Sequence, residues 1–279
     1  MAMAKRETGP SATARRAPDP APATAAEERA LLAMVDHAVA AGRARLAFQP
    51  IVVARSPHRP MFYEGLIRIL EPSGRVIPAC DFITVVEPTP LGRRIDALAL
   101  RQGFAALRER AQLRLSINMS ARTIDDPGWM AELERGLAAD PTAAERLILE
   151  VTESSPVTAP DRVAAFIDML QALGIAFAVD DFGAGFTSMR HLREFRFDIL
   201  KIDGSLCGDV ATNPDSLALV TAIVGIARHF EMMVVAERVE RAADAETLAR
   251  IGVDGLQGYL FAAPTLWPDW RDCVQDRSA

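Results

Sequence analysis

The sequence predicts an α/β fold, a modified TIM-type (β/α)8 barrel whose first strand runs antiparallel. Strand-like apolar runs alternate with amphipathic helical patterns along most of the chain, which is typical of parallel βαβ units. The patterned region holds eight such runs, which fits a closed barrel. The connection between the first two runs is too short to cross over a sheet, so we expect these two strands to be antiparallel neighbours.

The N-terminal residues 1–25 are rich in Ala, Pro, Thr and Arg and show no periodic apolar pattern. We predict a disordered tail here, because such a composition cannot bury enough surface to offset chain entropy. A transit peptide is the alternative. Residues 26–279 are expected to form one barrel domain, which opens with a helix from Glu27 that stops near Gly42.

The strands and helices of the barrel are predicted from apolar periodicity. The expected strands are Arg45–Val53, Met61–Leu70, Leu113–Asn118, Leu147–Val151, Ala176–Asp180, Ile199–Ile202, Met233–Ala236 and Gly255–Leu256. The helical patterns include Ile95–Arg108, Arg162–Leu173, Leu217–Phe230 and Ala242–Arg250. The stretch between Asp181 and Asp198 predicts only a short helix. An open doubly wound sheet is the alternative fold, but its Gly-rich phosphate loop after the first strand is missing.

Composition and charge exclude several function classes. The net charge of −6 argues against binding a nucleic acid polymer, which favours a basic face. No apolar run approaches the roughly 18 residues that span a bilayer, so we expect no membrane insertion. Cys80, Cys207 and Cys273 are widely separated, which indicates free thiols rather than disulfides or a zinc site. We therefore expect a cytoplasmic protein.

Polar side chains gather where predicted strands end. Glu64 lies within the second strand, and the others follow strand ends: Asn118, Glu150, Glu153, Asp180, Asp181, Lys201, Asp203, Glu237 and Gln257. Any one of them is explained equally well by a loop that begins there. The carboxyl ends of barrel strands converge at one mouth, however, where catalysis is built. As a set, these residues predict a site.

The acidic residues of this set indicate metal binding. Asp180 and Asp181 are adjacent, and neighbouring carboxylates repel unless they are neutralised. Carboxylate and amide oxygens are the ligands that Mg²⁺ and Mn²⁺ prefer. The set is larger than one ion needs, which favours two ions about 3.5–4 Å apart, as in hydrolytic sites. Lys201 either balances these acids in a salt bridge or holds an attacking water and the charge on a phosphoryl group.

Eight motifs in order identify a family. They are Gln49-Pro50-Ile51, Glu64-Gly65-Leu66 with Arg68, Asn118-Met119-Ser120, Glu150-Val151-Thr152-Glu153, Asp180-Asp181-Phe182-Gly183-Ala184-Gly185, Lys201-Ile202-Asp203, Ala236-Glu237-Arg238-Val239-Glu240 and Gln257-Gly258-Tyr259. Over about residues 27–266 the chain closely resembles EAL-domain cyclic-di-GMP phosphodiesterases. The resemblance implies a barrel with an antiparallel first strand, hydrolysis of cyclic di-GMP to linear 5′-pGpG, two Mg²⁺ or Mn²⁺ ions, inhibition by Ca²⁺, and a homodimer.

The resemblance also implies roles for single residues. Glu64, Asn118, Glu150 and Asp180 would bind one metal, and Asp181 and Glu237 would complete a second site that shares Asp180. Lys201 and Gln257, with Glu237, would be catalytic and hold the nucleophilic water. Glu153 would brace the Asp181–Ser188 loop. Gln49, Leu66 and Arg68 would face the dinucleotide.

The chain departs from the family pattern at a few positions. The signature Glu-Ala-Leu is Glu64-Gly65-Leu66, Ala184 replaces the usual Thr, and Phe186 and Thr187 replace the common Tyr and Ser. Arg238 stands where Gly is usual after Glu237 and would either crowd the site or contact phosphate. Pro90 stands where Gly is common. A catalytically weak or inactive receptor or interaction module for cyclic di-GMP is therefore the alternative function. Without the family resemblance, the residues support a third alternative, a general metallophosphohydrolase that acts on another substrate. Regulation is expected from the N-terminal tail, dimerisation or an unidentified regulatory protein.

Overall fold

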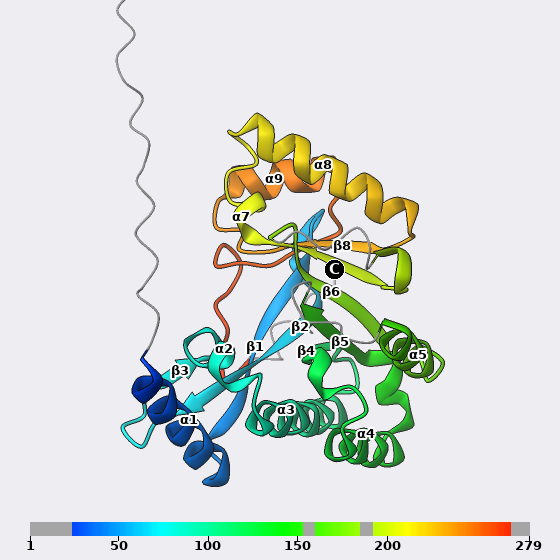
Figure 1. The fold of residues 1–279 in the computed structure, drawn as a ribbon. Coiled ribbons are helices and arrows are strands. Elements are labelled where there is room, and N and C mark those ends of the chain that lie inside the picture. Colours follow the sequence, from blue (N-terminus) through cyan, green and yellow to red (C-terminus); the bar gives the residue numbers. More distant parts are fainter. Residues whose placement is uncertain (1–23, 153–159, 185–191, 269–279) are drawn as a thin grey trace, which may run out of the picture.

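The chain forms a closed barrel in the computed structural model, which describes residues 24–152, 160–184 and 192–268 (Figure 1). The strands are β1 (Ala44–Val53), β2 (Ser56–Leu70), β3 (Val76–Pro78), β4 (Leu115–Asn118), β5 (Leu147–Thr152), β6 (Ala176–Phe182), β7 (Ile199–Ile202), β8 (Met233–Ala236) and β9 (Gly255–Leu256). Their order is β1-β9-β8-β7-β6-β5-β4-β2-β3, and a further pairing of β1 with β2 closes the barrel. The short β3 pairs with the end of β2, at residues 68–70.

The direction of the first strand confirms the prediction. Strand β1 is antiparallel to both of its neighbours, β2 and β9, whereas the pairs from β2–β4 through β8–β9 are parallel. Strand β2 begins at Ser56 rather than at Met61 as predicted, and Pro60 pairs with Val52. The ladder is irregular there, with register shifts at Val52. A proline that offers no N–H is tolerated at such a place.

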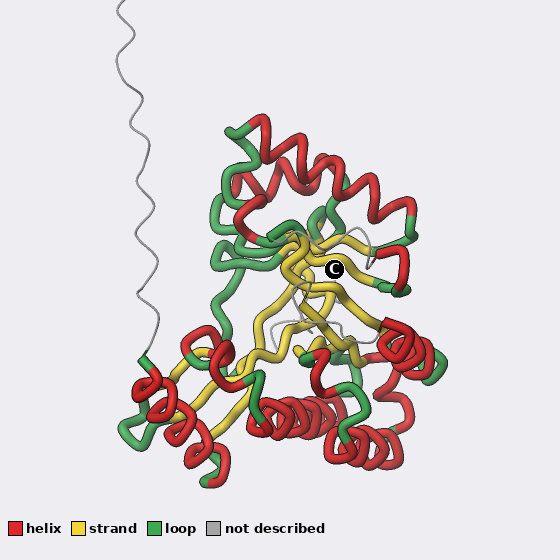
Figure 2. Tube along the Cα trace, viewed as in Figure 1, coloured by secondary structure: helices red, strands yellow, loops and turns green. Residues whose placement is uncertain are grey.

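Helices surround the strands (Figure 2). They are α1 (Ala25–Ala40), α2 (Ile83–Val86), α3 (Pro90–Glu109), α4 (Pro127–Ala139), α5 (Pro160–Gln171), α7 (Gly204–Cys207), α8 (Pro214–His229) and α9 (Ala242–Ile251), with 3-10 turns at Ala79–Asp81, Ala121–Thr123 and Pro141–Arg146. Thr24 and Glu27 form a capping box at the start of α1, and Gly42 follows its end with φ of +67°. None of the described helices combines the length and apolar character needed to cross a bilayer.

The barrel interior is filled from below by a compact apolar cluster. Its members come from six strands: Ile51, Phe62, Ile148, Ala178, Ile199 and Val235. A second, larger core lies between the barrel and the helices and includes Trp129, Phe166 and Phe177. This interior cluster forms an apolar floor. Side chains nearer the carboxyl ends of the strands lie above the floor and face the mouth of the barrel.

Some predictions fall outside the described residues. These include most of the predicted tail, Glu153, Cys273 and residues 185–188 of the Asp181–Ser188 loop. Between Asp181 and Asp198 the described part contains a helical turn at residues 192–194.

Candidate active site

The predicted site residues stand directly above the apolar floor of the barrel. Alternate residues of a strand point to the same face, so a side chain two positions beyond a floor residue also points inward. This relation links Phe62 to Glu64, Ile148 to Glu150, Ala178 to Asp180, Ile199 to Lys201 and Val235 to Glu237. Strand periodicity thus places one polar layer at the carboxyl end of the barrel.

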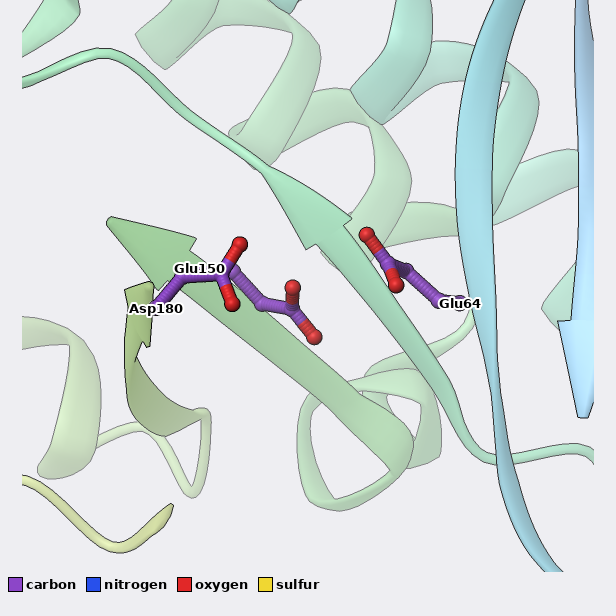
Figure 3. Close-up of side chains that lie close together, drawn as sticks. All are labelled: Glu64, Glu150 and Asp180. Carbon is purple, nitrogen blue, oxygen red and sulfur yellow. The ribbon is translucent and has the colours of Figure 1, made fainter. Parts of the chain in front are cut away.

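The carboxylates of this layer form two groups with the spacing of metal ligands. Oxygen atoms of Glu64, Glu150 and Asp180 lie within 4.8 Å of one another, and Figure 3 shows these side chains gathered from separate strands. Oxygen atoms of Asp180, Asp181 and Glu237 meet the same limit. Asp180 belongs to both groups. These are five of the six residues that the sequence predicts as ligands of two ions, and the sixth, Asn118, lies beside Glu64.

Lys201 lies at the centre of these acids and is fully buried. Its Nζ atom is 2.6 Å from Glu237, 2.7 Å from Glu150, 3.0 Å from Asp180 and 3.3 Å from Glu64. Burial alone lowers the pKa of Lys201, but the carboxylates, Asp180 foremost, outweigh burial and raise it well above the ordinary value. The ammonium therefore stays charged and holds the four carboxylates together.

One ammonium does not neutralise all of these acids. Burial, followed by repulsion from Glu64, raises the pKa of Glu150 to about 8. Burial and repulsion from Asp180 raise the pKa of Glu237 well above its usual value, and the same two causes raise that of Asp181 to about 6. Asp180 is the exception, because Lys201 and its hydrogen bonds outweigh burial and lower its pKa. The site therefore retains protons that a divalent cation would displace.

Two amide side chains complete the layer. Asn118 donates to Glu64 at 2.7 Å, and Gln257 donates to Glu64 at 2.7 Å and to Gln49 at 3.0 Å. Within the described part of the chain, Oε1 of Gln257 and Oε1 of Glu150 are buried without a hydrogen-bond partner. Buried oxygens rarely stay unpaired, so these two atoms suit a cation or an ordered water. The donor set is therefore compatible with divalent ions.

The backbone is strained beside Asp180, the residue common to both carboxylate groups. Asp181 has φ of +56°, a left-handed conformation that residues other than Gly seldom adopt. The amide N–H of Ala184 donates to the carbonyl of Asp181 at 3.2 Å and closes this turn. Strain of this kind persists only where the surrounding structure imposes it. Here it allows adjacent carboxylates, Asp180 and Asp181, to join the same group.

A cavity of about 500 Å³ opens beside the two carboxylate groups. The predicted dinucleotide-facing residues Gln49, Leu66 and Arg68 line it together with Asp180, Asp181, Glu237 and Gln257. Burial lowers the pKa of the Arg68 guanidinium, and nearby Cys80 and Glu64 oppose this. The structure therefore brings the predicted metal ligands and the predicted substrate residues into one site.

The cavity also has lining residues for which the sequence predicted no role in the site. They include Glu87, Asp96 and Tyr259. Arg238, for which the sequence left crowding or a phosphate contact as alternatives, lines the cavity as well. The carboxylate of Asp96 accepts hydrogen bonds from the Thr123 hydroxyl and the Ser120 amide, and the Ser120 hydroxyl donates to Glu87. Arg238 and Tyr259 belong to motifs that the sequence displays, whereas Glu87 precedes α3, Asp96 lies within it, and neither carries a strand-end signal. Glu153 lies outside the described residues.

Known proteins resemble this chain over most of its length. The EAL domain family model matches residues 32–264. The bifunctional diguanylate cyclase/cyclic di-GMP phosphodiesterase MucR of Pseudomonas aeruginosa is 32% identical over 248 residues, which cover 87% of this chain and 36% of MucR. Cyclic di-GMP phosphodiesterase PdeF of Escherichia coli is 32% identical over 223 residues, covering 78% and 30%. The chain thus spans about a third of the length of these curated relatives.

Solved structures share the fold. A PaMucR phosphodiesterase in complex with c-di-GMP matches with a TM-score of 0.74 at 31% identity, covering 85% of this chain and 97% of that one. The FimX EAL domain from Pseudomonas aeruginosa bound to c-di-GMP matches with a TM-score of 0.77 at 24% identity, covering 86% and 98%. The second likeness concerns the fold alone.

Proposed function

The chain belongs to the EAL-domain family, and from that membership we propose that it hydrolyses cyclic di-GMP to linear 5′-pGpG with two divalent ions, Mg²⁺ or Mn²⁺. The observation that carries the proposal is the pair of carboxylate groups that share Asp180, beside the buried Lys201 and a cavity. Relatives named as cyclic di-GMP phosphodiesterases supply the substrate.

The residues that would hold the ions follow from these groups. Glu64, Glu150 and Asp180, with the amide oxygen of Asn118, form the first set, and Asp180, Asp181 and Glu237 form the second. When bound, such ions lower the pKa of a water molecule towards neutrality and withdraw charge from phosphoryl oxygens. The same sites would take Ca²⁺, which we expect to support binding with little turnover.

Lys201 and Gln257 are proposed to orient the attacking water. The ammonium of Lys201 donates hydrogen bonds and stabilises negative charge, while the unpaired buried Oε1 of Gln257 is free to accept a hydrogen bond from that water. Glu237, 2.6 Å from Lys201, fixes the ammonium beside the second carboxylate group. Attack in line on one phosphorus would release the 3′ oxygen and open the ring.

Gln49, Leu66 and Arg68 are proposed to contact the dinucleotide, because they line the cavity beside the carboxylates. Arg68 supplies positive charge, and Leu66 supplies apolar surface. We extend the proposal to Glu153 as the residue that braces the Asp181–Ser188 loop, and to a cytoplasmic homodimer. Regulation by the N-terminal tail or a separate protein belongs to the same proposal.

The test is chromatography of the products after incubation of the purified protein with cyclic di-GMP and Mg²⁺ or Mn²⁺. The expected product is pGpG, and none should form with Ca²⁺ or with the Glu150→Gln variant. Tight calorimetric binding of cyclic di-GMP by metal-loaded, folded protein without pGpG would contradict hydrolysis and favour a receptor. Equal turnover of unrelated phosphodiesters would instead indicate a general phosphohydrolase.

A further inference from the structure

Arg238 occupies an unusual position at the site. It follows Glu237 directly, is exposed, and lines the cavity that the carboxylate groups border. Within the described residues, its guanidinium has no hydrogen bond or ion pair, although Asp181 is close enough for Arg238 to lower the pKa of that carboxyl. An arginine beside several acids that pairs with none of them remains available to another anion.

We propose that Arg238 binds a phosphate group of the nucleotide in this cavity. The proposal rests on the proposed function, because it takes the substrate to be a phosphodiester. A guanidinium offers a planar fork of donors that matches phosphate oxygens, and its charge persists at any physiological pH. Arg68, on β2, lines the same cavity, so the two arginines supply positive charge from separate elements for a substrate that carries two phosphates.

The backbone holds Arg238 in place at an energetic cost. Its φ is +51°, in the left-handed region that favours glycine. The neighbouring residues fix this conformation, since Glu237 donates its amide to the carbonyl of Ile202 at 3.2 Å and Val239 donates to that of Gln257 at 2.9 Å. Unfavourable backbone conformations that persist in this way cluster at functional sites.

The side chain of Arg238 has a prepared place against Gly204. A Cβ atom added at Gly204 would lie 2.5 Å from Cβ, 2.6 Å from Cγ and 2.5 Å from Cδ of Arg238. The aliphatic stem therefore packs over the start of α7 in space that exists only because residue 204 has no side chain. This contact limits the rotamers of Arg238 and reduces the entropy lost when its guanidinium binds an anion.

A metal-centred role for Arg238 is disfavoured by charge. A cation next to Asp181 and Glu237 opposes the binding of a divalent ion, so Arg238 is suited to contact an anion that binds with the ions rather than the ions themselves. The nucleotide supplies that anion. Removing the guanidinium should therefore weaken nucleotide binding while leaving metal affinity unchanged or slightly tighter, and this opposite response separates the two roles.

The test measures cyclic di-GMP affinity by calorimetry in Ca²⁺, and metal affinity without nucleotide, for Arg238→Gln, Arg238→Gly and Arg238→Lys. Loss of a charge-assisted hydrogen bond should weaken nucleotide binding about tenfold or more in the Gln and Gly variants and less in Lys. Arg196→Gln, the same change at an exposed arginine that does not line the cavity, should bind like the wild type. Unchanged nucleotide affinity in Arg238→Gln and Arg238→Gly would overturn the proposal.

Gly204→Ala provides a second test that changes no charge. The added methyl should displace the stem of Arg238 and weaken nucleotide binding in the wild-type background, but not in Arg238→Gly. Equal weakening in both backgrounds would count against the proposal. Affinity is read in Ca²⁺, so a wild type that binds cyclic di-GMP without hydrolysing it would contradict the proposed function and leave this comparison intact.

Discussion

Nζ of Lys201 and Oε1 of Glu237 lie 2.6 Å apart and join the carboxyl ends of neighbouring strands β7 and β8. Lys201 makes three further ion pairs, with Glu64, Glu150 and Asp180. The candidate site is therefore already cross-linked electrostatically across the barrel, and removal of the ammonium should affect both stability and activity.

Lys201→Met should destabilise the protein and inactivate it. Breaking a buried ion pair by removing one partner typically costs about 3–5 kcal/mol, because the remaining charge is left unpaired. We expect a loss of this order in the free energy of unfolding, measured by urea denaturation with EDTA, and a loss of at least about 100-fold in kcat. Arg135→Met, at an exposed ion pair, should change stability by less than about 1 kcal/mol. A fully active Lys201→Met variant would refute the assigned role.

Metal stoichiometry should report the two carboxylate groups separately. The wild type should bind two Ca²⁺ or Mn²⁺ ions in a calorimetric titration. Asp181→Asn should lose the second site and keep the first, whereas Glu64→Gln should lose the first site and keep the second. Asp180→Asn should weaken both sites, because Asp180 belongs to both groups. Chelation should lower the melting temperature, since ions that bind only the folded state stabilise it. Two intact sites in Asp181→Asn would exclude this assignment.

Metal binding should release protons and strengthen as pH rises. The pKa of Glu150 is raised to about 8 by burial and by Glu64, so near neutral pH this group is largely protonated before the ion binds. The ion needs the carboxylate, and apparent affinity should therefore increase with pH and level off, for this group, above about pH 8. Titrations in buffers of different ionisation enthalpy count the protons. Glu150→Gln should release about one fewer, whereas pH-independent affinity would contradict the prediction.

Asp96 should make the protein less stable as pH rises through the weakly acidic range. Burial raises its pKa to about 7 from 3.8, so between these values the folded state binds more protons than the unfolded chain. The stabilisation is complete below pH 3.8 and lost by about pH 7, up to about 4 kcal/mol at 1.36 kcal/mol per pKa unit. Asp96→Asn should flatten this dependence in urea denaturation, while Asp36→Asn, at an exposed ion pair, should not. An unchanged slope in Asp96→Asn would rule out this group.

Gly65→Ala, which restores the family signature, should be tolerated. A Cβ at residue 65 would lie 3.3 Å from Cδ1 of Leu46, the end of a flexible side chain, and 3.4 Å from the Ser116 carbonyl. Small shifts of Leu46 can relieve this, and alanine loses less backbone entropy than glycine in a strand, by roughly 0.5–1 kcal/mol. Melting temperature and kcat/KM should stay close to wild type, the latter within about twofold. A loss of about tenfold or more would show that Gly65 is required.

Most of the site residues were predicted from their places at the carboxyl ends of strands, and strand periodicity explains why they point inward. Residues two positions apart on a strand share a face, so Glu150 points inward like the floor residue Ile148, and Lys201 points inward like Ile199. The antiparallel direction of the first strand was predicted from the short connection before β2. The start of β2 at Ser56 was not predicted, because the proline-containing end of this hairpin shows no apolar alternation. Glu87 and Asp96 were missed as lining residues because Glu87 precedes α3 and Asp96 lies within it, away from any strand end.

The sequence by itself determined the order of strands, the inward positions of the acids and the kind of cation that their oxygen atoms favour. These properties depend on local periodicity and side-chain type. Tertiary structure alone decided which acids lie within 4.8 Å of one another, how one buried ammonium contacts four carboxylates, and that Gly204 makes room for Arg238. Such relations join residues from strands far apart in the chain. Closure of the barrel brings them to within a few ångströms, and no local pattern encodes those distances.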